Sequence, residues 1–287
     1  MVPTTSSTPQ SPVSSGQAHH SAHPGPEGVD PDNFHRIYAG EPSRVGGDAG
    51  GQARGSAGGQ ARDGASRQSC DGAGDPGIKP SAPWTTAKVP APWAIGRPQR
   101  AIAELAARDF FEGPVLDIGC GTGENAILLA YRGLEVVGVD LVPKAIEMAN
   151  ANAARAVTAN AVAGERAMRI APAFHVGSAL DLRACTGGRT FRTLLDCAVL
   201  HVFSDTDRER YRESVTAAAE PGARIVVLVF SEHETRPGGP RRMSVRDIER
   251  TLGPRWSLVR VQPARYEHIS HDGGARSWLA VLRHRVG

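Results

Sequence analysis

Apolar residues recur with two different periods along the chain from residue 97 onward. Short apolar runs, which are typical of buried strands, alternate with longer segments that have one apolar face and are typical of helices. The apolar runs predict strands at 114–118, 135–139, 172–176, 193–200, 223–230, 256–262 and 276–284. The amphipathic segments predict helices at 97–112, 123–132, 143–163, 205–219 and 244–252. Alternation of this kind predicts an α/β fold, in which helices cover both faces of a parallel sheet.

The first 90 residues lack this pattern. Nearly half of the 33 glycines and just over half of the 21 prolines lie there, together with a direct repeat at 50–54 and 58–62. Such a segment buries too little apolar surface to offset the entropy lost on ordering it. We therefore predict a mostly disordered region at 1–82, with 33–38 as a candidate ordered lid. One folded domain is expected at 83–287.

Charge and cysteine content exclude several classes of protein. The net charge is +3, and no basic face interleaved with aromatic residues suggests a nucleic-acid partner. No apolar run is long enough to span a membrane, and the N-terminus lacks the apolar stretch of a signal peptide. The four cysteines show no spacing typical of a zinc site, so no metal is expected. We expect a cytoplasmic protein that is a monomer or a weak dimer.

The segment 115–123, with the sequence VLDIGCGTG, carries the strongest functional signal. A strand ends in Asp117, glycines follow at alternate positions, and a helix begins behind them. Glycines let a ligand approach the backbone, and the first turn of a helix offers unpaired N–H groups. Asp140 ends the next strand, where an acid can accept both hydroxyl groups of a ribose. This arrangement predicts a nucleoside-binding turn.

The spacing of the glycines distinguishes a site for a dinucleotide from a site for S-adenosylmethionine. Dinucleotide-binding domains need G-x-G-x-x-G, with a pyrophosphate at the helix N-terminus. Here the pattern is G-x-G-x-G, and the acid Asp117 stands before the first glycine, where it would repel a pyrophosphate. S-adenosylmethionine carries an ammonium and a sulfonium and no phosphate. The pattern therefore favours S-adenosylmethionine over a nicotinamide cofactor.

The strand–acid–G-x-G-x-G pattern, followed by Gly138-Val-Asp140, resembles the class I S-adenosylmethionine-dependent methyltransferases over roughly residues 92–285. The resemblance implies a doubly wound, mostly parallel seven-stranded sheet of the Rossmann-like methyltransferase type, closed by an antiparallel hairpin. It also implies cofactor-binding residues at the carboxyl ends of four strands. These are Asp117, Gly119, Gly121 and Gly123 under the methionine, Asp140 and Leu141 at the ribose and adenine, Ser178 and Ala179 at the adenine, and Asp196 beside the reacting methyl.

A second motif lies upstream, at Pro92-Trp-Ala-Ile-Gly-Arg-Pro-Gln99. Together with Tyr38-Ala-Gly40 it resembles small-molecule methyltransferases related to the thiopurine and tellurite-resistance enzymes. The most similar type is actinobacterial and acts on quinone-like or hydroxylated heteroaromatic compounds, but here about fifty residues separate the two halves. The resemblance implies a lid over the cofactor, in which Trp93 and Arg97 contact it. The alternative is a hydrophobic plug on the sheet edge, with Arg97 solvated.

The acceptor is expected to be a small molecule, because the loop 231–240 is short and no protein-docking insertion follows it. The sequence after the fourth strand, Asp196-Cys-Ala-Val, lacks the N-P-P-Y pattern that holds exocyclic amines of nucleic acids. His201 and His233 follow two strands and are candidate bases for a hydroxyl acceptor. We therefore predict O-methylation of a hydroxylated aromatic or heterocycle. N- or S-methylation, or a cofactor-binding protein without catalysis, are the alternatives.

Overall fold

The computed structural model describes residues 34, 36, 91–163 and 168–286. The domain boundary predicted at residue 83 and Tyr38 of the upstream motif lie outside these residues. Apart from positions 34 and 36, so does the region 1–82 that the composition predicts to be disordered. Both expectations therefore remain predictions from the sequence.

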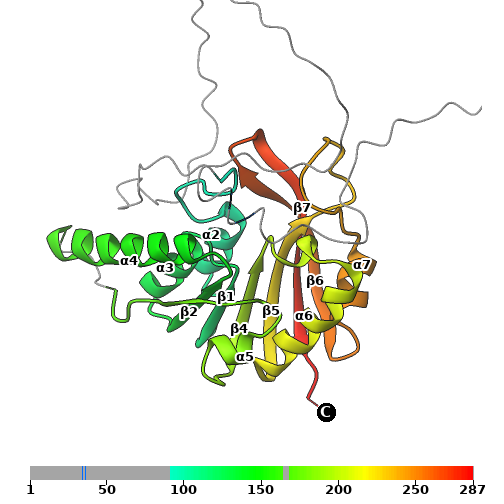
Figure 1. Ribbon diagram of the computed structural model, residues 1–287, viewed down its shortest axis with the longest axis horizontal. Helices are drawn as coiled ribbons and strands as arrows, with labels where there is room; N and C mark the ends of the chain where they lie inside the picture. The colour runs from blue at the N-terminus through cyan, green and yellow to red at the C-terminus, as the bar shows by residue number, and fades with distance from the viewer. Residues whose placement is uncertain (1–33, 35, 37–90, 164–167, 287) are drawn as a thin grey trace, which may run out of the picture.

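A single sheet organises the described residues, with its strands in the order β3-β2-β1-β4-β5-β7-β6 (Figure 1). Six strands are parallel and β7 alone runs antiparallel to its neighbours. This confirms the predicted fold class. The strands are β1 (Val115–Ile118), β2 (Val136–Asp140), β3 (Ala173–Val176), β4 (Phe191–Cys197), β5 (Ala219–Phe230), β6 (Trp256–His268) and β7 (His271–His284).

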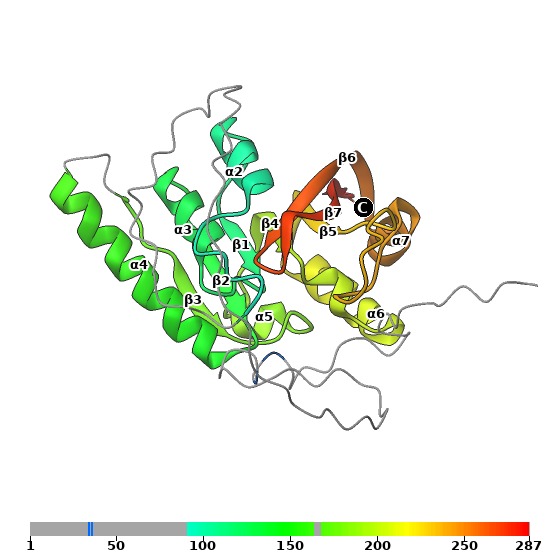
Figure 2. The same ribbon diagram turned by 90° about the horizontal axis from the view of Figure 1, so that it is seen from above.

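Helices cover both faces of the sheet, as Figure 2 shows from above. On one face lie α2 (Arg100–Ala107), α3 (Glu124–Tyr131) and α4 (Pro143–Ala163), and on the other α5 (Leu182–Cys185), α6 (Asp205–Ala217) and α7 (Val245–Leu252). Each face encloses its own apolar core. Neighbouring residues of a strand point to opposite faces, so Val115 joins the core under α2–α4, whereas Leu116 and Ile118 join the other. Asp117 shares the face of Val115, which explains why this acid is buried.

The β6–β7 hairpin extends well beyond the lengths that the sequence predicts. Pairing between β5 and β7 ends at Phe230 and Ser277, but β6 and β7 remain paired out to His268 and His271. The extra length rises above the carboxyl ends of the parallel strands, at the top of Figure 1. There the Ile269 N–H donates to the Pro92 carbonyl at 2.8 Å. We call the hairpin tip 263–275 together with the segment 91–99 the roof of the site.

The fourth strand is shorter than predicted, because β4 ends at Cys197 rather than at residue 200. Ala198 has φ of 72°, which an extended strand does not allow, and a short 3-10 helix, η1 (Leu200–Val202), follows. The short helix α5 also has no counterpart in the sequence prediction. The helix predicted at 97–112 is confined to α2, whereas the bounds of α4 match the prediction.

Candidate active site

The glycine-rich turn after β1 has a shape that only glycine allows. Gly119 has φ of +64°, and a Cβ on it would lie 2.2 Å from Cγ2 of Val199 in the turn after β4. Gly123 has φ of +88° at the N-cap of α3, where a Cβ would lie 2.8 Å from Phe174. Gly121 is also left-handed, with φ of +55°. The three predicted glycines therefore form one compact turn that brings the ends of β1 and β4 together.

Asp117 is the most unusual group of the site. Its side chain is buried, and neither carboxylate oxygen accepts a hydrogen bond of good geometry, although the nearby Ala126 N–H of α3 partly offsets the rise in its pKa. Burial raises the pKa of Asp117 well above its ordinary value, and the nearby charges of Asp140 and Glu124 add to this. A buried acid without a partner is costly unless a cation or a donor joins it. The ammonium of S-adenosylmethionine is such a partner, so the turn fits this cofactor.

The predicted ribose and adenine residues lie at the ends of the next two strands. Asp140 accepts from the Gly121 N–H and from the Val142 N–H, both at 2.9 Å, and thereby links the turns after β1 and β2. The apolar side chain of Leu141 is 39% exposed, so it is accessible to a ligand. Ser178 accepts from the Leu180 N–H at 3.1 Å, and Ala179 beside it is half-buried.

The carboxylate of Asp196 is not directed at the site. It is fully buried and accepts from the N–H groups of Val199 and Leu200 and from the hydroxyl of Tyr211. Burial raises its pKa to about 6 despite these bonds. The acid therefore fixes the turn that follows β4. It is the side chain of Val199 in this turn, rather than the predicted Asp196, that lies beside Gly119 in the turn after β1.

Trp93 and Arg97 take different roles in the roof. Trp93 packs edge-to-face on Phe34, with 5.6 Å between the ring centroids. Both rings lie in a cluster with Val142, the residue that follows the predicted adenine contact Leu141. Arg97, in contrast, donates twice to Glu267 of β6, at 2.9 and 2.7 Å. The expectation that Arg97 meets the cofactor's carboxylate therefore finds no support, because β6 supplies an acid 170 residues away in sequence.

Gln99 strengthens the same connection within the roof. Its side-chain amide exchanges two hydrogen bonds of 2.8 Å with the backbone of Glu267, and its own N–H donates to Asn125 at the start of α3. The motif 92–99 thus joins the hairpin tip to the helix behind the glycine turn. Because Arg97 and Gln99 are both bonded to Glu267, neither faces a cofactor carboxylate, and the lid over the cofactor stays a prediction.

His201 is a packed histidine rather than an accessible base. Its ring is buried against Phe230 at 5.2 Å, and its Nδ1 accepts from the Phe230 N–H at 3.1 Å. Burial lowers the pKa of His201 to about 3. Such an imidazole does not take up a proton near neutral pH. The structure therefore disfavours the predicted role of His201 as a general base.

Replacing His201 by Asn tests whether the imidazole is buried in its neutral form, through the pH dependence of the free energy of unfolding. The pKa of His201 is about 3 in the folded state and near 6.5 when unfolded, so between these values only the unfolded chain binds the proton. We expect wild type to lose stability relative to His201→Asn as pH falls below 6.5, by about 1.4 kcal/mol per pH unit. The raised pKa of Asp196 changes stability with pH in the opposite direction. Asp196 is present in both proteins, so its contribution cancels from the difference between them. Urea unfolding at pH 7, 6 and 5 measures the difference, and a constant difference would contradict the burial of a neutral ring.

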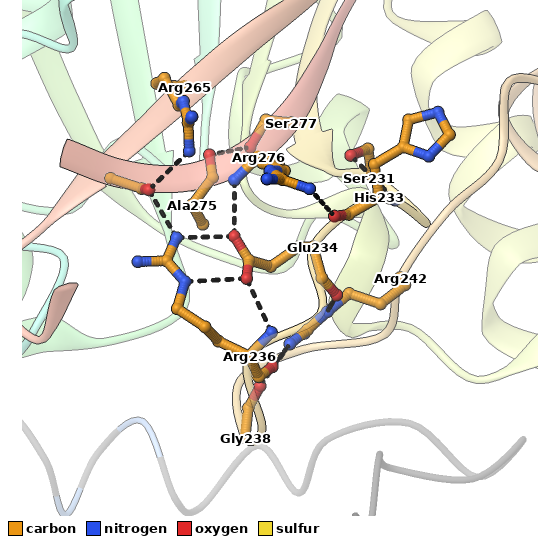
Figure 3. Close-up of polar contacts among 11 residues, drawn as sticks. Ser231, His233, Glu234, Arg236, Gly238, Arg242, Arg265, Ala275, Arg276 and Ser277 are labelled. Carbon is orange, nitrogen blue, oxygen red and sulfur yellow. Dashed lines mark hydrogen bonds and ion pairs between the residues drawn. The ribbon is translucent and has the colours of Figure 1, made fainter. Parts of the chain in front are cut away.

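His233, the second predicted base, lies in an exposed loop, with its ring against Trp278 at 5.4 Å. Figure 3 shows that the ring points away from Glu234, the buried acid of the same loop. Glu234 pairs with Arg236 through two bonds of 2.9 and 2.7 Å, and it accepts from the Arg276 N–H at 2.7 Å. Arg236 lowers the pKa of Glu234 far below its ordinary value. This ion pair fastens the loop 231–242 to the base of the hairpin tip.

An aromatic group beside β5 could not be found from the sequence. Phe230 at the end of β5 lies 5.6 Å from the ring of Tyr266 and 5.9 Å from that of His268, both on β6. The guanidinium of Arg242 covers Phe230 at 5.3 Å. The extended hairpin brings Tyr266 and His268 to Phe230, whereas Arg242 reaches it from the loop that follows β5. Phe230 also contacts the ring of His201, in the turn that follows β4.

Within the described parts of the chain, no three acidic, histidine or cysteine side chains come together as a metal site would require. The same residues contain no helix with the length and apolar character needed to cross a bilayer.

Comparison with known proteins agrees with this geometry. The family model of thiopurine S-methyltransferase matches residues 100–280, which include the glycine turn, the loop 231–242 and most of the hairpin. The chain belongs to the thiopurine S-methyltransferase family. As a member of this family it is a methyltransferase that uses S-adenosylmethionine and acts on a small molecule.

Individual relatives extend the comparison. The 2-heptyl-1-hydroxyquinolin-4(1H)-one methyltransferase of Mycobacteroides abscessus is 35% identical over 192 residues, which are 64% of this chain and 78% of the relative. The probable thiol methyltransferase 2 of Arabidopsis thaliana is 25% identical and aligns with 57% of this chain and 67% of its own. A structure solved in work on the conversion of a disulfide bond into a thioacetal group during echinomycin biosynthesis has a TM-score of 0.56 and 28% identity. It covers 68% of this chain and 85% of that one.

Proposed function

We propose that this member of the thiopurine S-methyltransferase family methylates an oxygen atom of a small, flat, hydroxylated heteroaromatic compound. The observation that carries the proposal is the aromatic group of Phe230, Tyr266 and His268 at the ends of β5 and β6, where Phe230 also contacts the ring of His201 in the turn after β4. Aromatic side chains favour planar ligands, which they contact by offset or edge-to-face packing. The 35% identity to a methyltransferase of a hydroxyquinolinone supports the same class of acceptor.

The turns after β1 and β2 supply the groups that would hold the cofactor. Asp117 would accept from its ammonium, Asp140 from the ribose hydroxyls, and Leu141 with Ser178 and Ala179 would border the adenine. When bound, S-adenosylmethionine supplies a sulfonium methyl whose C–S bond breaks as the acceptor oxygen donates its electron pair. The chain's own task is to hold the acceptor in line with that methyl and to exclude water.

The roof is suited to exclude water, because it is bonded to the rest of the site at several points. Arg97 and Gln99 join it to β6, and Trp93 packs on Phe34 beside the β2 turn. Opening the site would break these contacts together. We propose that opening of the roof admits the acceptor, and that closure of the roof precedes transfer.

Proton removal needs no histidine if the acceptor arrives as an anion. His201 has a pKa of about 3 and a buried ring, and His233 faces Trp278. An N-hydroxyl or acidic enol of a heteroaromatic compound ionises in water without help. We therefore propose that the chain selects acceptors that are already ionised, rather than ionising them itself.

A panel of acceptors tests this function. We expect transfer to 1-hydroxyquinolin-4(1H)-one to be faster than transfer to a simple phenol, a thiol or an amine of similar size. The rate at low acceptor concentration should follow the ionisation of each acceptor, without a further ionisation from the protein. Mass detection of methylated product over a range of pH gives both results. Preferred transfer to thiols, which the family name and the Arabidopsis relative would favour, would replace oxygen by sulfur as the acceptor atom.

A further inference from the structure

The hairpin tip 263–275 extends beyond the support of the sheet. β7 pairs with β5 only as far as Ser277, and the register between β6 and β7 shifts between Tyr266 and His268. Gly273 and Gly274 of β7 have φ of 73° and 69°, so the regular ladder is interrupted there. The tip therefore depends on contacts from outside the hairpin for a fixed position.

Glu267 makes these contacts on one side of the tip. Its carboxylate accepts from Arg97 at 2.9 and 2.7 Å and from the Arg100 N–H at 2.8 Å. The side-chain amide of Gln99 donates to the carbonyl of Glu267 and accepts from its N–H, both at 2.8 Å, as a neighbouring strand would do along the edge strand β6. Although burial disfavours its charge, Arg97 and Arg100 hold the pKa of Glu267 below its ordinary value. We call these bonds the Glu267 clamp.

The clamp lies within the part of β6 that carries two of the three aromatic residues. The ring of His268 lies 5.9 Å from that of Phe230 and 6.3 Å from that of Tyr266. Neighbouring residues of a strand point to opposite faces, so Glu267 reaches Arg97 while the rings beside it meet Phe230. Phe230 and Tyr266 are buried and His268 is half-buried, so His268 is the ring of this group that a ligand would reach first.

A second carboxylate fastens the base of the tip from the opposite side, as Figure 3 shows. Arg236 and the Arg276 N–H both donate to Glu234, whose side chain is only 4% exposed. The side chains of Arg97 and Glu267, in contrast, are 52% and 22% exposed. Water and salt compete more readily for an exposed pair, so the Glu267 clamp is the attachment that is more easily weakened.

We propose that Arg97 and Gln99 are positioning residues for the acceptor, because the Glu267 clamp holds His268 against Phe230. With the clamp formed, the aromatic group is already arranged for a flat ligand, and less binding free energy is lost in ordering the tip. The inference rests on the proposed function, in which this aromatic group contacts the acceptor. It gives the motif at 92–99 a role in binding the acceptor, instead of the carboxylate of the cofactor.

Arg97→Gln tests this role, with Arg100→Gln as the matched control. The Arg100 side chain is 80% exposed and pairs with Glu104, and its replacement keeps the N–H that donates to Glu267. We expect Arg97→Gln to raise the Michaelis constant for 1-hydroxyquinolin-4(1H)-one by about 3- to 10-fold, as for a partly exposed charged pair. The turnover number should change by less than about 2-fold, because the bound acceptor itself holds the tip in place. Affinity for S-adenosylhomocysteine should stay the same, and the control should match wild type.

Amide hydrogen exchange of the ligand-free protein tests the clamp separately from catalysis. The N–H groups of Glu267 and Ile269 donate across the boundary between the tip and the segment 91–99, each at 2.8 Å. Their exchange with solvent reports how often this boundary opens. We expect both to exchange faster in Arg97→Gln, and also in wild type as sodium chloride is raised. The Arg276 N–H, at the base of the hairpin, should be unaffected by either change.

Each arm has a result that contradicts the inference. Unchanged exchange at Glu267 and Ile269 would show that the clamp does not hold the tip. Faster exchange with an unchanged Michaelis constant, or an equal loss of affinity for S-adenosylhomocysteine, would overturn its role in acceptor binding. Absence of methyl transfer to any oxygen would instead overturn the proposed function. The exchange rates would still decide for or against the clamp, and the Michaelis constant would be measured with whichever acceptor the enzyme methylates.

Discussion

Replacing Asp117 by Asn is expected to weaken S-adenosylhomocysteine binding by about 2–5 kcal/mol, which is roughly 30- to 5,000-fold. The buried carboxylate accepts no hydrogen bond of good geometry in the free protein, so its predicted function is to meet the ammonium of the ligand. Isothermal titration calorimetry measures the loss. Asp140→Asn would be less informative, because Asp140 also holds the turns after β1 and β2 through the N–H groups of Gly121 and Val142.

The same variant should make the ligand-free protein more stable. The folded-state pKa of Asp117 is raised by burial, so the folded protein holds this proton more tightly than the unfolded chain, and stability is lost as pH rises from about 4. Asn does not ionise, and we expect it to add about 1 kcal/mol or more at pH 8. Asp109→Asn, at an exposed residue after α2, is the control and should change neither quantity. Unchanged ligand affinity in Asp117→Asn would show that the ammonium is held elsewhere.

Replacing Gly119 by Ala should cost about 2–5 kcal/mol of folding stability. Its φ of +64° strains any residue with a Cβ, and that Cβ would lie 2.2 Å from Val199. Gly133→Ala separates the two causes, because Gly133 has φ of +83° and nothing within 4 Å of the added atom. The control should therefore lose only about 1–2 kcal/mol, as expected for the left-handed backbone alone.

A double variant completes this test. Adding Val199→Ala to Gly119→Ala removes the methyl group that the new Cβ meets, so part of the lost stability should return. Urea unfolding of wild type, Gly119→Ala, Gly133→Ala and the double variant gives the four free energies of unfolding. The affinity of each protein for S-adenosylhomocysteine reports whether the glycine turn is still formed. Equal losses at residues 119 and 133 would mean that Val199 does not hold the turn closed.

Patterns of residues close together in the sequence were sufficient to predict the α/β architecture. The glycine turn, the acids Asp117 and Asp140, and the start of α4 at Pro143 all depend on residues close in sequence, and the structure places them as predicted. The mostly parallel seven-stranded sheet with an antiparallel hairpin, which the family resemblance implied, is also present. Where local backbone conformation overrode the apolar pattern, as at Ala198 after β4, the predicted strand was too long.

The parts of the site that could not be predicted depend on contacts between distant segments. The apolar pattern gave no reason for β6 and β7 to continue past the sheet, and nothing near Arg97 indicated that Glu267 would pair with it. Asp196 was expected at the cofactor because it ends a strand, but Tyr211 and two backbone groups take up its carboxylate. Likewise, the burial of His201 follows from its packing against Phe230, which is distant in sequence.

The position of the transferred methyl tests the central claim most directly. Purified enzyme is incubated with 1-hydroxyquinolin-4(1H)-one and S-adenosylmethionine labelled with ¹³C in the methyl group, and the product is examined by NMR. We expect a single labelled methyl bonded to oxygen, with formation of S-adenosylhomocysteine in equal amount. A labelled methyl on nitrogen or carbon, or no transfer to this acceptor while a thiol or amine is methylated, would contradict it.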